Sequence, residues 1–352
     1  MNQTNEHSDE ALKSYYYHLG AADVFCEMVR AGVKKIALSH PCGSKEERDR
    51  FLPDFTDLCE KYGVSYYVED DPIITDLFPK AMNLGKFQVI FYQDDECLRQ
   101  YLDLKKEKAD AVENGTYAMI RADLAYRYGK LLSYTDEGIR RLLLETGKTA
   151  LVSVEEMRSR DLQTIESGTS GTALMGRAAR GIYKAYDGFR DGTVILCGSG
   201  NNGGDGYALS AVLSEEGISS RVLVMSEKTT PESAYYKEKA LACGVSMEEY
   251  RPGTHQLDHA PVVVDCLLGT GFQGEVREPY RSAIQEMNDA RKSGAFVISA
   301  DINSGMNGDR GTGSLITDSD LTVTIGLMKT GLLTEAAMAH IGRLALADIG
   351  IL

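Results

Sequence analysis

Residues 194–206 read VILCGSGNNGGDG, and this stretch indicates the fold class of the chain. The first four residues form a short apolar run, which is typical of a strand buried on both faces of a parallel sheet. Five of the next nine residues are glycine, so the main chain there can lie directly against a ligand. A helical pattern over residues 208–216 follows, and a helix N-terminus offers free N–H groups to phosphate. The stretch therefore predicts a strand, a ligand-binding loop and a helix, with a tight turn lacking any ligand as the alternative.

Similar apolar runs recur toward the C-terminus and predict further strands. They lie at residues 222–225, 262–264, 296–298 and 321–325. Helical patterns precede or separate them, at residues 154–166, 171–187, 233–242 and 280–292. Alternation of strands and helices with short loops predicts a Rossmann-like, three-layer α/β/α sandwich with a mostly parallel sheet over residues 149–352.

The first part of the chain, residues 1–148, is poorer in glycine than the rest and is predicted to be a smaller α/β domain of unknown function. The patterns predict helices at residues 10–31, 45–62 and 74–84, and strands at 35–38, 64–68 and 87–92. Helices are then expected to dominate residues 96–145. A length of 352 residues agrees with two domains, and we place their boundary near residue 148.

Composition narrows the classes of function. The chain has 38 basic and 52 acidic residues, and this excess of acid gives no support to a nucleic-acid-binding surface. Its seven cysteines are odd in number and form no CxxC motif, so neither a disulfide framework nor a thiolate metal site is indicated. No uncharged apolar run is long enough to span a bilayer, and the N-terminus lacks the apolar core of a signal peptide. We therefore expect a cytoplasmic protein that binds neither nucleic acid nor membrane.

Polar side chains follow three of the predicted strands. Asn202 follows the first, Asp265 ends the third and Asp301 ends the fourth, with Ser304 shortly after it. Because the carboxyl ends of parallel strands meet at one edge of a sheet, these side chains are expected to face one crevice. Taken singly, either aspartate could be a helix cap or a structural acceptor. Together, such oxygen groups can transfer protons or coordinate a hard cation.

Four motifs in this order resemble the NAD(P)HX epimerase family, also described as the YjeF N-terminal domain. They are GSGNNGGDG at 198–206, DCLLGTG at 265–271, ADINSG at 300–305 and the closing DIGI at 348–351. The resemblance extends over about residues 150–352, including EEMR at 155–158 and Asp161, but not over residues 1–150. Two positions depart from the family: Asn303 stands where proline is common, and Gly176 where a glutamate usually follows the methionine.

The resemblance implies an isomerase that interconverts the R and S forms of hydrated NADH or NADPH, so that a separate dehydratase can complete repair of the cofactor. It also implies a homodimer and a potassium ion bound by Asn202, Asp265 and Ser304. The substrate would be held by Asn201, Asn202, Gly203, Gly204, Asp205, Gly269, Thr270, Gly271, Phe272, Gln273, Gly274, Glu275 and Asp301. For proton transfer, Asp265 is the first candidate and Asp301 the second.

Two other functions are alternatives to the epimerase. A non-catalytic nucleotide-binding or scaffolding module of the same fold would keep the pocket without the chemistry. An NAD-dependent dehydrogenase is disfavoured, because the glycine spacing is not GxGxxG and no ribose-binding acid follows it. For Lys329, the sequence left ligand contact and a surface position equally open.

Overall fold

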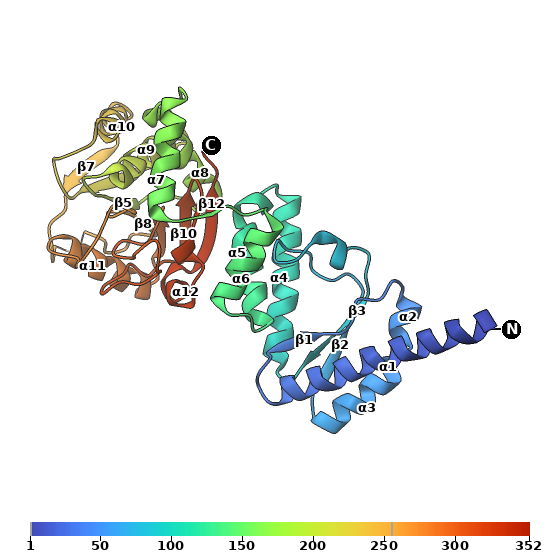
Figure 1. Ribbon diagram of the computed structural model, residues 1–352. Helices are drawn as coiled ribbons and strands as arrows, with labels where there is room; N and C mark the ends of the chain where they lie inside the picture. The colour runs from blue at the N-terminus through green and yellow to red at the C-terminus, as the bar shows by residue number, and fades with distance from the viewer. Residues whose placement is uncertain (1, 255) are drawn as a thin grey trace. The chain divides into compact units, whose positions relative to one another are not determined.

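The computed structural model describes residues 2–254 and 256–352, with side chains from residue 12 onward, and the chain divides into two compact units (Figure 1). The first unit comprises residues 2–117 and 124–149, and the second comprises residues 118–123 and 150–352. Each unit has its own sheet and its own hydrophobic core.

The second unit is built on a seven-stranded sheet in which every neighbouring pair of strands is parallel. Its strand order is β12-β10-β9-β8-β5-β6-β7. The strands are β5 (Thr193–Cys197), β6 (Ser220–Val224), β7 (Ser246–Glu249), β8 (Val262–Cys266), β9 (Phe296–Ala300), β10 (Leu321–Ile325) and β12 (Arg343–Ala347). A separate short parallel pair joins β4 (Leu151–Val152) to β11 (Met328–Lys329).

Helices cover both faces of this sheet, which confirms the predicted Rossmann-like three-layer architecture. The helices of the unit are α7 (Val154–Glu166), α8 (Gly171–Ala185), α9 (Asn201–Glu215), α10 (Pro231–Ala242), α11 (Tyr280–Lys292) and α12 (Glu335–Ile341), with a 3-10 turn, η2, at Thr330–Leu332. In β5, Ile195 and Cys197 belong to the core beneath α8 and α9, whereas Val194 and Leu196 belong to the core beneath α11. Burial on both faces explains why the strand sequence is continuously apolar.

Helices α7 and α11 have the predicted bounds, most other elements differ from the predicted bounds by a few residues, and the larger differences concern both edge strands of the sheet and the start of α9. Strand β7 reads SMEE and lies at the sheet edge, where its carboxylates are exposed to water. It therefore carries no apolar run. Strand β12 at the opposite edge was also not expected. Helix α9 begins at Asn201 rather than at residue 208, so much of the expected glycine-rich loop is helix.

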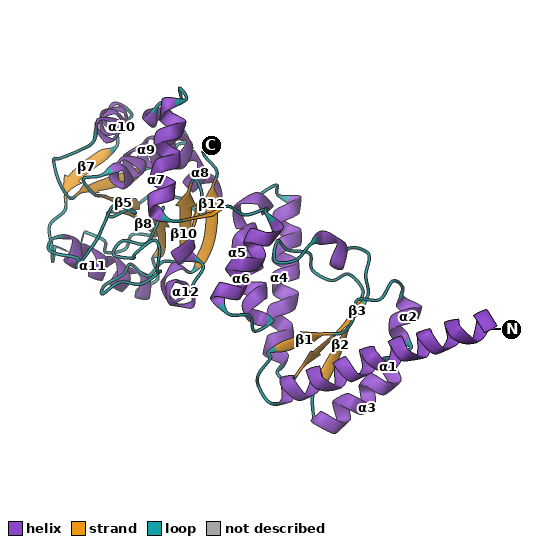
Figure 2. Cartoon of the chain, viewed as in Figure 1, coloured by secondary structure: helices purple, strands orange, loops and turns teal. Residues whose placement is uncertain are grey.

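The first unit contains a three-stranded antiparallel sheet of order β1-β3-β2 (Figure 2). Its strands are β1 (Ile36–Leu38), β2 (Ser65–Glu69) and β3 (Gln88–Tyr92). Its helices are α1 (Asn2–Arg30), α2 (Lys45–Asp49), α3 (Leu52–Tyr62), α4 (Asp95–Glu113) and α6 (Asp136–Thr146), with a 3-10 turn, η1, at Lys80–Met82. Helix α5 (Tyr117–Leu131) contains the residues that are divided between the two units.

Two helix predictions in the first unit are wrong. No α-helix forms over residues 74–84, where the structure has an irregular segment and the short turn η1. Pro79 lies within that pattern, and proline in a helix interior removes a hydrogen bond and clashes with the preceding turn. The helix expected at residues 45–62 is divided into α2 and α3, with Pro53 in the first turn of α3.

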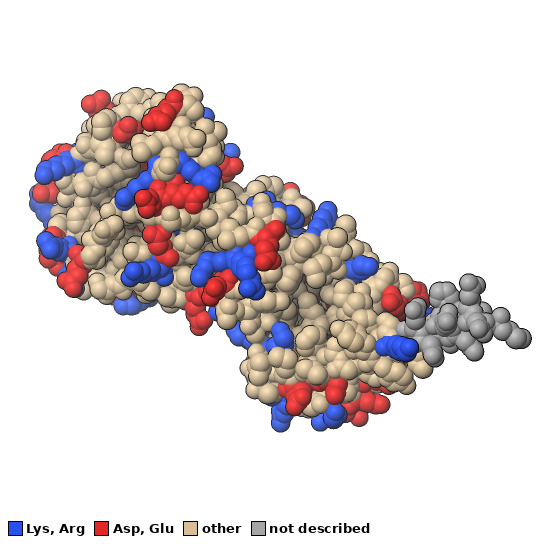
Figure 3. Space-filling view, in the orientation of Figure 1, with Lys and Arg blue, Asp and Glu red and all other residues tan. Residues whose placement is uncertain are grey.

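The described helices include none that is both long enough and apolar enough to cross a membrane. All seven cysteines are free thiols, and five of them are buried. On the face shown in Figure 3, acidic and basic side chains are interspersed.

Candidate functional site

A cavity of about 620 Å³ lies at the carboxyl edge of the seven-stranded sheet, where β5, β8 and β9 end. This is the edge at which parallel α/β sheets bind their ligands. Eight of the residues predicted to hold substrate line the cavity: Asn201, Asn202, Asp205, Gly269, Thr270, Gly271, Phe272 and Asp301. The structure thus brings together loops that follow three different strands.

The other predicted residues lie outside the cavity lining. Gly203 and Gly204 are buried within α9, while Gln273, Gly274 and Glu275 are exposed beyond the cavity. From the glycine-rich stretch, the cavity is lined by Ser199 and Gly200 just before α9 and by Asn201, Asn202 and Asp205 in its first turns.

The glycines at the start of α9 permit a close approach of backbone segments. A Cβ atom on Gly203 would lie 2.0 Å from the carbonyl oxygen of Gly198, and one on Gly198 would lie 1.9 Å from the carbonyl oxygen of Leu267. Neither distance leaves room for a side chain. These glycines thus bring the N-terminus of α9 against the ends of β5 and β8, with its free N–H groups beside the cavity.

Asp301 and Lys329 form a buried ion pair in the wall of the cavity. The Lys329 ammonium, with a side chain 1% exposed, donates to Asp301 Oδ1, to Thr324 Oγ1 at 3.1 Å and to the Ile325 carbonyl at 2.6 Å. The Ile325 N–H also donates to Asp301 Oδ1, at 3.2 Å. Asp301 has a left-handed backbone with φ of 65°, which turns the chain sharply at the end of β9. Lys329 therefore lies in the site and not on the surface.

Asp265, the first candidate for proton transfer, does not line the cavity. Its carboxylate is fully buried and accepts four hydrogen bonds: from the Leu267 and Ser304 N–H groups and from the Ser299 and Ser304 hydroxyls. Burial raises the pKa of Asp265, while the hydrogen bonds from Ser304 oppose that shift. Its oxygens join the end of β8 to the loop after β9, and of the two predicted aspartates only Asp301 lines the cavity.

Asn202 is buried beside this carboxylate network with its amide group unused. Its side chain is 7% exposed, and neither Oδ1 nor Nδ2 has a partner among the residues that the structure describes. Its Cβ lies next to Gly269, one residue after Leu268, whose N–H donates to Ser304 Oγ at 2.9 Å. A buried amide without partners is costly, so this position is suited to an additional bound group.

Helix α7 supplies two charged lining residues, Arg158 and Asp161. Arg158 donates to the Thr270 carbonyl at 3.3 Å, and Asp309 accepts from the N–H of Val154 at 2.8 Å, which anchors the start of α7. The EEMR motif and Asp161 were part of the family resemblance, but the sequence assigned them no role. Arg158 and Asp161 are three residues apart, which places them on one side of a helix. This spacing is the sequence signal that could have indicated them.

Thr230, at the start of α10, is a further lining residue that the sequence did not indicate. It caps α10 and also donates to Asn201 Oδ1 at 2.6 Å. A threonine immediately before Pro231 is a typical helix N-cap, so the cap itself was readable, but its place beside Asn201 depends on tertiary structure.

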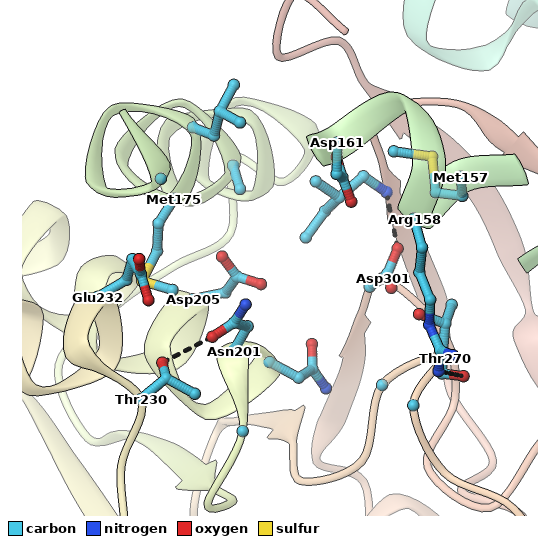
Figure 4. Close-up of a pocket in the computed structure, with 18 of the residues that line it drawn as sticks. Met157, Arg158, Asp161, Met175, Asn201, Asp205, Thr230, Glu232, Thr270 and Asp301 are labelled. Atoms are coloured by element: carbon cyan, nitrogen blue, oxygen red, sulfur yellow. Dashed lines mark hydrogen bonds between the residues drawn. The ribbon is translucent and has the colours of Figure 1, made fainter. Parts of the chain in front are cut away.

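The cavity holds an unusual concentration of carboxylates. Asp161, Asp205 and Asp301 point toward the same space (Figure 4). Burial raises the pKa of Asp161 to about 6; nearby Asp301 adds to the shift, whereas Lys329 opposes it. Burial also raises the pKa of Asp205 well above its ordinary value, and the nearby carboxylates reinforce this effect.

The two departures from the family pattern have local explanations. A side chain on Gly176 would place its Cβ 2.3 Å from the hydroxyl of Tyr236, which donates to the Thr172 carbonyl. Tyr236 therefore fills the space that a glutamate would need. Asn303 is fully buried, donates to the Thr317 and His340 carbonyls, and accepts from the Thr322 hydroxyl. It replaces a proline with a set of hydrogen bonds.

A parallel sheet covered on both faces, with its ligand cavity at the carboxyl ends of the strands, places the second unit in the class of Rossmann-like α/β domains. A family model described as YjeF-related protein N-terminus matches residues 171–331. The NAD(P)H-hydrate epimerase of Limosilactobacillus fermentum is 30% identical over 202 residues, covering 56% of this chain and 95% of that protein. The chain belongs to the NAD(P)HX epimerase family of YjeF-related N-terminal domains, as the motifs predicted.

Longer relatives contain the same region. The bifunctional NAD(P)H-hydrate repair enzyme Nnr of Archaeoglobus fulgidus is 34% identical over 205 residues, covering 56% of this chain and 42% of that protein. The chain thus spans less than half the length of this relative. Among solved structures, the crystal structure of yeast ynu0 matches 55% of this chain and 84% of that chain, with 19% identity and a TM-score of 0.47.

Proposed function

We propose that this protein is an NAD(P)H-hydrate epimerase, which interconverts the R and S forms of hydrated NADH or NADPH. The observation that carries the proposal is the cavity in which the N-terminus of α9 and the Asp301–Lys329 pair meet. The helix N-terminus suits the phosphates of a dinucleotide. The carboxylates suit a ring that becomes transiently positive when its hydroxyl leaves.

The activity is tested with a mixed pool of R and S hydrated NADH and a dehydratase that consumes only the S form. We expect the purified chain to accelerate consumption of the R form above the uncatalysed rate. If the R form disappears no faster than in buffer while the chain still binds NADH, the epimerase proposal fails and a non-catalytic binding module replaces it. The dehydratase in the assay takes the place of the separate enzyme that would consume the S form.

A potassium ion forms part of the proposal, held by the Asn202 amide oxygen, Asp265 and Ser304. The unpartnered amide of Asn202 fits a hard cation with oxygen ligands, whereas Asp265 would have to give up one of its four hydrogen bonds to join it. The described residues contain no group of three His, Cys, Asp or Glu side chains suited to a metal, so carbonyl and hydroxyl oxygens would complete the site. The ion would supply fixed positive charge beside the loops that bind substrate.

Replacing potassium with lithium at equal ionic strength is expected to lower the stability of the protein. A ligand that binds only the folded state at a hundred times its dissociation constant stabilises by about 2.7 kcal/mol. Thermal unfolding monitored by circular dichroism measures this difference. The Asn202→Ala variant should lose the difference between the two salts, whereas Asn201→Ala should keep it. Equal midpoints for the unaltered protein in both salts would contradict the ion site.

Arg158 is expected to anchor an anionic part of the substrate, because its guanidinium is an exposed cation in the cavity lining. The Arg158→Ala variant should raise KM about tenfold with little change in kcat, which is the pattern for lost binding common to ground and transition states. Steady-state kinetics in the coupled assay measure both constants. Arg180→Ala is the matched control, since Arg180 is an exposed arginine of α8 that pairs with Glu215 outside the cavity. An unchanged KM for the Arg158 variant would refute this role.

For the chain as a whole, we propose that residues 149–352 carry the activity in a homodimer and that residues 1–148 form a separate α/β domain. The bifunctional NAD(P)H-hydrate repair enzymes among its relatives support a functional link to a dehydratase. Sedimentation of the full chain tests the dimer.

A further inference from the structure

The four aspartates around the site differ in how their carboxylates are used. Asp265 accepts four hydrogen bonds, and Asp301 is held by Lys329 and by the N–H of Ile325. By contrast, within the part of the chain that the structure describes, no hydrogen bond or ion pair occupies Asp161 or Asp205. Fully bonded carboxylates hold structure, whereas free carboxylates facing a cavity are available to a ligand.

Asp161 and Asp205 approach the cavity from different elements. Asp161 extends from α7, whose start is fixed by Asp309, and Asp205 extends from the first turns of α9 (Figure 4). The rigid close contact at Gly203 fixes the start of α9 and hence the direction of Asp205. Both side chains are therefore positioned by helices and not by loops, and the space between them is open.

We propose that Asp161 and Asp205 are the two proton-transfer residues of the epimerisation, one serving each face of the hydrated ring. This inference rests on the proposed function and assigns the chemistry within it. Asp301, fixed by Lys329, then supplies negative charge next to the ring without exchanging a proton.

In one direction, Asp205 gives its proton to the ring hydroxyl. The C–O bond breaks, its electron pair leaves with the oxygen as water, and the lone pair of the ring nitrogen forms a C=N bond. Water then attacks the other face of the same carbon. The new C–O bond uses an oxygen lone pair, the C=N pair returns to nitrogen, and Asp161 takes the released proton. In the opposite direction the two aspartates exchange roles, and proton exchange with solvent restores them.

The electrostatic environment agrees with these roles. The charged groups facing the pair are Lys329, Asp301 and Arg158, with Glu232 in the same lining from α10. Burial raises the pKa of Asp205 well above its ordinary value, which favours the protonated acid. The pKa of Asp161, raised to about 6, leaves it mostly ionised at neutral pH and yet a stronger base than an exposed aspartate. Two carboxyls whose environments separate their pKa values are suited to acid and base.

The test compares Asp161→Asn and Asp205→Asn with the unaltered chain in the coupled assay across pH. Each variant is expected to lose about 100-fold or more in kcat, with KM changed less than about threefold. The rate of the unaltered chain should rise as pH increases through about 6, and Asp161→Asn should lose this rise. Asp161→Glu should recover part of the rate, because it restores a carboxylate.

Glu156→Gln is the matched control, since Glu156 is an exposed carboxylate of α7 paired with Arg160. This variant should stay within about twofold of the unaltered rate.

Two further measurements keep the outcome decisive. Binding of NADH should persist in both asparagine variants, which shows that the cavity still forms. Because the fold raises the pKa of Asp161, its ionisation costs stability as pH rises through about 6. Asp161→Asn should therefore unfold at a higher temperature than the unaltered chain at pH 7.5, and not at pH 3.5.

The results separate this inference from the proposed function. If the unaltered chain epimerises and either asparagine variant keeps more than about a third of kcat, Asp161 and Asp205 are not the pair. If the unaltered chain shows no epimerisation, the proposed function itself fails. Loss of rate with an unchanged pH profile in Asp161→Asn would also overturn the inference, because a residue that only supports the fold does not set that profile.

Discussion

The Asp301→Asn variant is expected to unfold with a free energy lower by about 3 kcal/mol and to lose about 100-fold or more in kcat. Asparagine keeps the left-handed backbone that Asp301 adopts, so the change removes charge without forcing the turn. It leaves the Lys329 ammonium, 1% exposed, without a carboxylate. An unpaired buried charge costs more stability than the loss of an exposed ion pair. The expected loss in free energy of unfolding is therefore larger than for a surface pair.

A double variant, Asp301→Asn with Lys329→Met, separates stability from catalysis. Removing both charges should recover most of the lost free energy of unfolding, measured by urea denaturation, because no unpaired ion remains. The rate should stay low, since the carboxylate beside the ring is still missing. Asp289→Asn breaks the exposed pair with Lys292 and should change stability by less than about 0.5 kcal/mol. A double variant as unstable as Asp301→Asn would show that the pair is not what stabilises this wall.

The Gly203→Ala variant is expected to lose about 3 kcal/mol of unfolding free energy and most of its affinity for NADH. Alanine is favoured over glycine in helices by up to about 1 kcal/mol, so propensity alone predicts no loss of stability. The new Cβ would lie 2.0 Å from the Gly198 carbonyl oxygen, however, and backbone on both sides of the contact leaves little room to adjust. The steric cost should exceed the gain in propensity and displace the N-terminus of α9 from the cavity.

Gly20→Ala is the matched control for that substitution. Gly20 also lies within a helix, α1, but a Cβ atom there would meet nothing within 4 Å. It should leave stability unchanged or raise it by up to about 1 kcal/mol. Urea denaturation measures both variants, and fluorescence titration with NADH measures binding. If Gly203→Ala were as stable as the unaltered chain, the close contact would not be what requires glycine.

Local sequence patterns determined much of the fold. The apolar runs of β5, β8 and β10 predicted buried strands because helices on both faces leave no polar side. The same reasoning failed for β7, whose sequence is polar because an edge strand faces water on one side. The helix prediction for residues 74–84 was wrong for another reason. It rested on the spacing of apolar residues, but Pro79 within the segment disfavours a helix.

The sequence by itself determined where the site lies, because polar residues at the ends of parallel strands must share one edge of the sheet. It did not decide which carboxylates face the ligand. Asp265 and Asp301 both end apolar strands, yet the tertiary structure bonds the first to Ser304 and presents the second, paired with Lys329, to the cavity. Likewise, Asp161 enters the site only because α7 packs against it. Strand ends are local properties of the chain, whereas the partners of a carboxylate lie on other segments, 39 residues away for Asp265 and Ser304 and 28 residues away for Asp301 and Lys329.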